Sequence, residues 1–139
     1  MTPPLSADRL TARVFAVLYL AQAVFGVGLW AVFFGVDALR REVELLPGHP
    51  EVMDAFFYPD ILIVVVSVLC ALGLVQGRRW TVPLTGFLAG CLVYPTLFLA
   101  GWLAFTGVGG VVLAVMVPPS TMSSWLAWQT QRLHRPGVR

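Results

Sequence analysis

The chain alternates long apolar segments with short polar ones, and the length of the apolar segments is the strongest signal in the sequence. Crossing about 30 Å of hydrocarbon takes roughly 20 apolar residues in a helix. Residues 14–36 contain no charged side chain, and residues 56–76 contain a single one, Asp60. No charged residue lies between Arg79 and Arg132. That uncharged run is too long for one crossing and predicts two.

A cluster of glycines at residues 107–110 divides this run, because clustered glycines mark turns. The third and fourth predicted spans are then residues 80–105 and 108–128. Backbone polar groups in lipid must be satisfied internally, which favours helices, and the continuous apolar character of each segment argues against a β-barrel. We therefore expect one all-α domain over residues 1–139, an integral membrane four-helix bundle.

The arginines predict the orientation of the spans. Arg9 and Arg13 precede the first span, and Arg78 and Arg79 join the second span to the third. The fourth span is followed by Arg132, Arg135 and Arg139. An even number of spans puts these groups on one side, and the positive-inside rule makes that side cytoplasmic. The loop between the first two spans carries more acidic residues than arginines. We expect both termini in the cytoplasm and the spans in the plasma (inner) membrane.

The loop after the first span has a helical pattern of its own. Its apolar residues recur close to helical spacing, at Val36, Leu39, Val43 and Leu46, and charges occupy the other positions. The pattern predicts a short amphipathic helix on the outer membrane surface, ended by Pro47 and Gly48. The bilayer is thus a partner for this loop as well as for the spans.

Composition supports a membrane protein and excludes several functions. The chain is 58% hydrophobic and 12% charged, against about 25% charged in soluble domains. The net charge of +2 and the lack of a basic cluster with interleaved aromatics argue against nucleic-acid binding. All basic residues are arginines, which suggests a GC-rich, bacterial genome. We expect no metal and no cofactor, because zinc spacing, a nucleotide loop and a histidine within a span are all missing.

Two glycine pairs flank the arginines at residues 78–79. Gly73 and Gly77 lie before them, and Gly86 and Gly90 after them. Small residues four apart allow helix backbones to approach closely. The pairs predict packing of the second span against the third, or, as an alternative, an interface between two copies of the chain.

Asp60 is the candidate with the clearest chemistry. One interpretation is a helix cap, since a carboxylate is favoured at a helix N-terminus. The other is a proton acceptor or a cation-binding carboxylate at the mouth of a pocket, because ionisable residues within spans are usually functional.

A proline-bearing polar layer is the second candidate. Pro95 in the third span and Pro118 with Pro119 in the fourth are equally distant from the glycine turn. Consecutive prolines are expected to break or kink the fourth span, and broken helices form substrate sites in transporters. The alternative is a kink whose freed carbonyls bond to nearby hydroxyls. The candidate ligand-binding residues are Asp60, Tyr58, Tyr94, Thr96, Ser120 and Thr121.

Three functions fit these features. The first is a non-catalytic role through helix packing, as an accessory subunit of a larger membrane complex or as a homo-oligomer, which the missing catalytic motifs favour. The second is a binder or carrier of a small apolar or cationic molecule in an intramembrane pocket near Asp60, Tyr94 and Ser120. The third is a membrane enzyme acting on a lipid-like substrate, with Asp60 as acid or base.

Overall fold

The computed structural model of the chain describes residues 6–43, 45–46 and 48–134, and its described elements are all helices. These are α1 (Ser6–Gly35), α2 (Asp37–Glu42), α3 (Pro50–Asp54), α4 (Phe57–Val75), α5 (Thr81–Thr106) and α6 (Gly110–His134). Four of them, α1, α4, α5 and α6, are long and apolar enough to cross a membrane. They coincide closely with the four predicted spans, except that α1 begins earlier and α6 runs on past residue 128.

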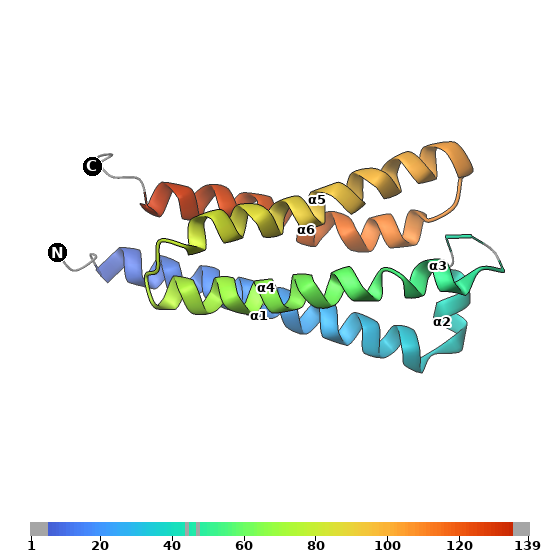
Figure 1. Cartoon of the computed structure of the whole chain (residues 1–139), viewed down its shortest axis with the longest axis horizontal. Coiled ribbons are helices and arrows are strands. Elements are labelled where there is room, and N and C mark those ends of the chain that lie inside the picture. The colour runs from blue at the N-terminus through green and yellow to red at the C-terminus, as the bar shows by residue number, and fades with distance from the viewer. Residues whose placement is uncertain (1–5, 44, 47, 135–139) are drawn as a thin grey trace.

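The long helices are arranged as two pairs (Figure 1). Helix α1 packs along α4, and α5 packs along α6, while α4 with α5 and, less extensively, α1 with α6 join the pairs. The start of α1, the α4–α5 turn and the end of α6 lie at one end of the molecule, which we call the arginine end. It carries the exposed Arg9, Arg13, Arg78, Arg79 and Arg132, whereas Arg135 and Arg139 lie outside the described residues. The opposite end, with α2, α3 and the α5–α6 turn, is the loop end.

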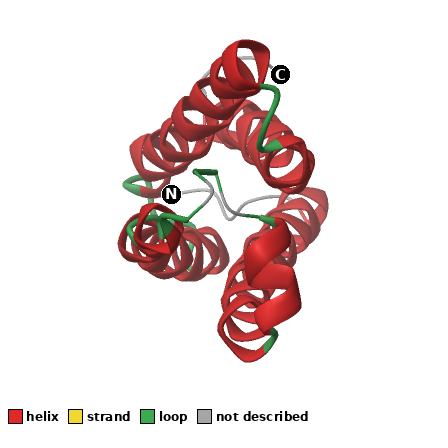
Figure 2. Ribbon diagram, turned by 90° about the vertical axis from the view of Figure 1, so that its right-hand side faces the viewer, coloured by secondary structure: helices red, strands yellow, loops and turns green. Residues whose placement is uncertain are grey.

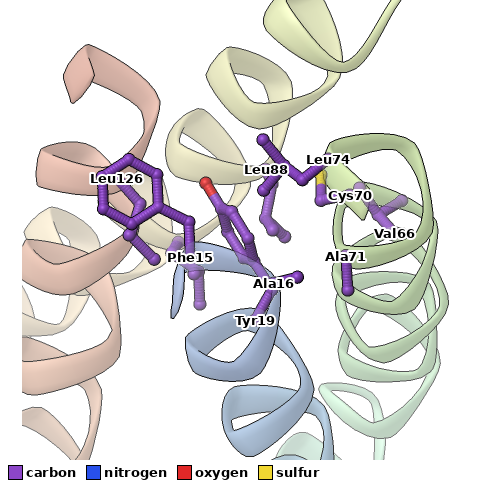
Figure 3. Packing of buried hydrophobic residues seen from close by; sticks show 10 residues of the cluster. Phe15, Ala16, Tyr19, Val66, Cys70, Ala71, Leu74, Leu88 and Leu126 are labelled. Carbon is purple, nitrogen blue, oxygen red and sulfur yellow. The ribbon is translucent and has the colours of Figure 1, made fainter. Parts of the chain in front are cut away.

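All four long helices contribute to a core toward the arginine end (Figure 3). Tyr19 of α1 is fully buried there, against the small side chains of Cys70 and Ala71 on α4. Leu88 and Leu126 complete the contact from α5 and α6. Small residues on α4 leave room for the tyrosine ring, so that α1 and α4 can approach closely.

A buried polar link connects three of the long helices. Gln22 of α1 donates through Nε2 to Ser67 Oγ of α4 at 3.2 Å, and Ser123 Oγ of α6 donates to Gln22 Oε1 at 2.6 Å. Ser67 in turn donates to the carbonyl of Ile63. Interhelical hydrogen bonds in membranes contribute about 0.6 kcal/mol on average. Leaving one of these buried groups unpaired costs about 1–3 kcal/mol, so the link mainly fixes the register of the helices.

The four glycines flanking the arginines have different environments. A Cβ at Gly73 would collide with Thr81 Oγ1 and lie 2.8 Å from the Trp80 ring, so α4 and the start of α5 do approach closely here. Gly77 lies beyond α4 and has a φ of 65°, a turn conformation that glycine adopts readily. Nothing lies within 4 Å of a Cβ at Gly86 or Gly90. These two fall between the buried positions of α5, so the structure does not place them in the hairpin contact.

The prolines do not break the helices. Helix α6 is continuous through Pro118 and Pro119, so the predicted half-helix beginning at Ser120 is not formed. Proline's fixed φ suits a helix, and only its missing N–H and its ring disturb the preceding turn. Thr121 Oγ1 donates to the carbonyls of Val117 at 3.0 Å and Pro118 at 2.9 Å, one turn after the carbonyls that the two prolines leave without an N–H partner.

We expect Gly73→Leu to destabilise the protein in detergent, because a side chain at this position has no room between α4 and Trp80. Overpacking of this kind costs about 1–3 kcal/mol. Gly86→Leu is the matched control: it gains the same helix propensity but meets open space, so its melting temperature should be no lower than that of the wild type. Equal losses for the two variants in a thermal unfolding assay would contradict the packing described here.

Candidate functional site

A cavity of about 110 Å³ lies toward the loop end, between the four long helices and the first loop (residues 36–56). Its apolar walls come from α1, α5, α6 and the loop, and include Phe33, Leu45, Met53, Pro95, Leu99 and Met116. Trp30 and Asp60 also line it, and Asp60 is the one ionisable residue among the described residues of the lining. Cavities that are mostly apolar with few polar groups are typical of small-molecule sites.

Asp60 faces α1 across the cavity. It lies in the first turn of α4, is partly buried, and accepts a hydrogen bond from Trp30 Nε1 to Oδ2 at 2.8 Å. The N-cap of α4 is Phe56, which makes no side-chain cap. Asp60 therefore lies both in the first turn of α4 and in the cavity lining.

Aromatic contacts hold Trp30 in position. Its ring centroid lies 5.0 Å from that of Phe33 and 5.3 Å from that of Phe57, both edge to face, and 5.5 Å from that of Phe34. Aromatic pairs of this geometry contribute about 0.5–1.5 kcal/mol beyond the area they bury. With only 8% of its surface exposed, Trp30 keeps its N–H directed at Asp60.

The carboxylate of Asp60 has no basic partner among the described residues. The ion pairs of the described residues are Arg40 with Asp54 and His49 with Glu51. Trp30 supplies a hydrogen bond but no charge. Asp60 thus offers an uncompensated carboxyl group to whatever enters the cavity.

Described residues of the first loop line the cavity, namely Val43, Leu45, Met53 and Phe56. Figure 2 shows the helices of the molecule seen from the loop end. Leu45 is 3% exposed and packs with Trp30, Phe33 and Leu99. Its Cδ2 lies 2.8 Å from where a Cβ on Gly109 would be, so the leucine fits against the α5–α6 turn because that turn carries glycine. The loop therefore forms part of the cavity wall.

The short helix predicted over residues 36–46 is present in part as α2, which ends at Glu42. Val43 and Leu45 line the cavity, whereas Val36 and Leu46 are exposed. The side chain of Leu39 and Pro47 lie outside the described residues. An ion pair explains the inward fold: Arg40 bonds both oxygens of Asp54, at 2.7 and 2.6 Å, and draws α2 toward α3.

The other candidate residues lie outside the cavity lining. Tyr58 and Tyr94 are each 75% exposed, and Thr121 is exposed as well. Thr96 donates to the carbonyl of Leu92, and Ser120 is buried on α6. The sequence analysis singled out Asp60 and the proline-bearing polar layer. Of these residues, Asp60 and Pro95 line the cavity.

Sequence reasoning did not single out Trp30, Phe33, Leu45 or Met53. Trp30 gave one usable signal, since tryptophan concentrates at membrane interfaces and this one lies several residues inside an apolar run. No sequence pattern pointed to Leu45 or Met53, because their inward direction depends on the Arg40–Asp54 ion pair.

Comparisons with protein families, curated proteins and solved structures found no match.

Among the described residues, no three His, Cys, Asp or Glu side chains are grouped to hold a metal ion. A carboxyl group, an indole N–H and apolar walls provide the means to bind and orient a molecule.

We expect Asp54→Asn to loosen the first loop, because the ion pair with Arg40 would be lost. A Leu45→Cys reporter, in a chain whose Cys70 and Cys91 are replaced by alanine, should then react several-fold faster with a water-soluble maleimide. Asp37→Asn removes a charge from the same loop without breaking this pair and should leave the rate unchanged. Equal rates for the three backgrounds would show that the ion pair does not hold the loop.

Proposed function

We propose that this chain is a small multi-pass protein of the plasma (inner) membrane that binds a small hydrophobic molecule in the cavity beneath its first loop. Large apolar side chains cover its outer surface, with Phe105 94% and Val24 71% exposed. Such a surface suits lipid, whereas extended apolar patches on soluble monomers are rare. The arginine end then lies in the cytoplasm and the first loop outside.

The observation that carries the proposal is a partly open, apolar cavity with one carboxyl group. An engineered cavity of about 150 Å³ in another protein is large enough to hold benzene. At about 110 Å³, this cavity suits a small branched or ring-shaped group, with the remainder of the ligand extending through the opening.

Binding is better supported than catalysis. Acid–base chemistry by paired carboxylates needs a second acidic group, and Asp54 and Glu51 are the nearest in sequence. Asp54 is paired with Arg40, and Glu51 with His49. Neither lines the cavity. An enzyme acting on a lipid-like substrate would have to work with Asp60 alone.

A homo-oligomer or a larger membrane complex is the second candidate, and the outer face of α5 favours it. Gly86 and Gly90 have open space beside them, and Phe87 and Tyr94 are exposed nearby. A second helix could approach closest at the two glycines, with the rings packing alongside. This role is compatible with ligand binding, since the cavity lies on the inner side of the same helix.

Topology is tested with reporter fusions. Fusions after Pro47 should report the extracytoplasmic side, and fusions after Arg135 the cytoplasmic side, because arginines are retained inside. A phosphatase and a fluorescent reporter with opposite compartment requirements provide the measurement. Both fusions on one side would contradict the four-span arrangement.

Ligand binding is tested by filling the cavity. A small hydrophobic probe such as tert-butylbenzene should raise the melting temperature of the purified protein in nanodiscs, since a ligand that binds only the folded state stabilises it. Val115→Phe places a ring in the cavity and should abolish the shift. Val117→Phe, an exposed position two residues away that does not line the cavity, should retain it. Loss of the shift in both variants, or in neither, would contradict binding at this site.

A further inference from the structure

Resting on the proposed function, we infer that the ligand is a hydrophobic monocation, an organic ammonium whose charge lies against Asp60. Its alkyl or aromatic substituents occupy the apolar part of the cavity. The inference concerns the class of ligand, whereas the proposed function requires only that a small molecule binds.

The first argument is the charge of the cavity. Among the described residues, Asp60 is the one ionisable residue of the cavity lining, and the basic residues that form ion pairs, Arg40 and His49, are bonded to other acids. A carboxylate among apolar side chains is unfavourable unless a counter-charge or hydrogen bonds compensate it. Trp30 provides one hydrogen bond, at 2.8 Å, and a bound cation would provide the missing charge.

The second argument is the aromatic surface beside the carboxylate. Trp30, Phe33 and Phe56 all line the cavity together with Asp60. The face of an aromatic ring attracts a cation within about 6 Å, tryptophan most strongly, and aromatic cages recognise quaternary ammonium groups in other proteins. Trp30 bonds Asp60 directly, and the guanidinium carbon of Arg40 lies 5.5 Å from the centroid of the Phe33 ring, so an aromatic ring of this lining already has a cation beside it. This aromatic surface favours a cation over a neutral molecule of the same shape.

The third argument excludes an inorganic ion. Ca²⁺ and Mg²⁺ require six or more oxygen ligands or retained water, and one carboxyl group in an apolar cavity does not replace a hydration shell. No cluster of three acidic, histidine or cysteine side chains occurs in the described residues. An ammonium ion with organic substituents spreads its charge and loses less hydration, so it suits one carboxylate and several rings.

The route to the site also suits a cation. Asp60 lies in the first turn of α4, beneath a loop that carries more acidic residues than arginines. An acidic surface raises the local concentration of cations and speeds their association.

The test compares two probes of nearly identical shape, phenyltrimethylammonium and its neutral isostere tert-butylbenzene. Binding to the full chain in nanodiscs of zwitterionic lipid is measured by saturation-transfer NMR and by ligand-induced thermal stabilisation. We expect the cation to bind at least tenfold more tightly than the neutral compound. In Asp60→Asn, which keeps the shape and removes the charge, this preference should disappear while the neutral compound still binds.

Two further variants separate the possible failures. Asp60→Glu keeps the negative charge, so it should retain a preference for the cation, which ties a loss seen in Asp60→Asn to the charge and not to the substitution as such. Asp37→Asn removes an exposed acidic residue of the first loop and should leave the preference near tenfold.

Equal binding of both probes to the wild type, or a cation preference that persists in Asp60→Asn, would overturn the inference while small-molecule binding stands. Binding of neither probe to the wild type, or unchanged binding in Val115→Phe, would overturn the proposed function as well.

Discussion

The hydrogen bond from Trp30 to Asp60 is the contact on which the loop-end half of the structure depends. It joins α1 to α4 at 2.8 Å and places the ionisable residue of the cavity lining beside an indole ring. The rings of Phe33 and Phe57 hold that indole, and the first loop closes over them through Leu45. Without this bond, the carboxyl group of Asp60 would lack this hydrogen-bond donor in an apolar environment, and the polar contact that joins α4 to α1 at the loop end would be lost.

The two halves of the molecule are built differently. Toward the arginine end, Tyr19 packs against small residues of α4, and Gly73 allows contact with the start of α5. Toward the loop end, the helices leave a space that side chains of the first loop fill only partly. A close-packed half thus supports a half that has room for a ligand, which is the usual relation between a rigid scaffold and a binding site.

The number and position of the long helices were predictable from the sequence, because the length of an uncharged run is a direct physical constraint. Asp60 was predictable for the same reason, as a charge within such a run. The cavity was not predictable from the sequence, because its lining depends on which side of a helix each residue occupies. Tyr94 and Pro95 are neighbours in sequence, yet the tyrosine is exposed and the proline lines the cavity. The inward turn after α2 depends on an ion pair between residues fourteen positions apart, which no local pattern contains.

The link among Gln22, Ser67 and Ser123 also bears on how the chain assembles. Synthesis proceeds from the N-terminus, so α1 and α4 are complete before α6 exists, and Gln22 Nε2 can bond to Ser67 as soon as these two helices pair. Its Oε1 must wait for the hydroxyl of Ser123, more than a hundred residues after Gln22. Because a buried acceptor without a donor is unfavourable, this oxygen gives the first helix pair a specific attraction for the second. Docking of α5 and α6 onto α1 and α4 would then be guided by the unsatisfied Oε1 of Gln22 as well as by the shape of the helices.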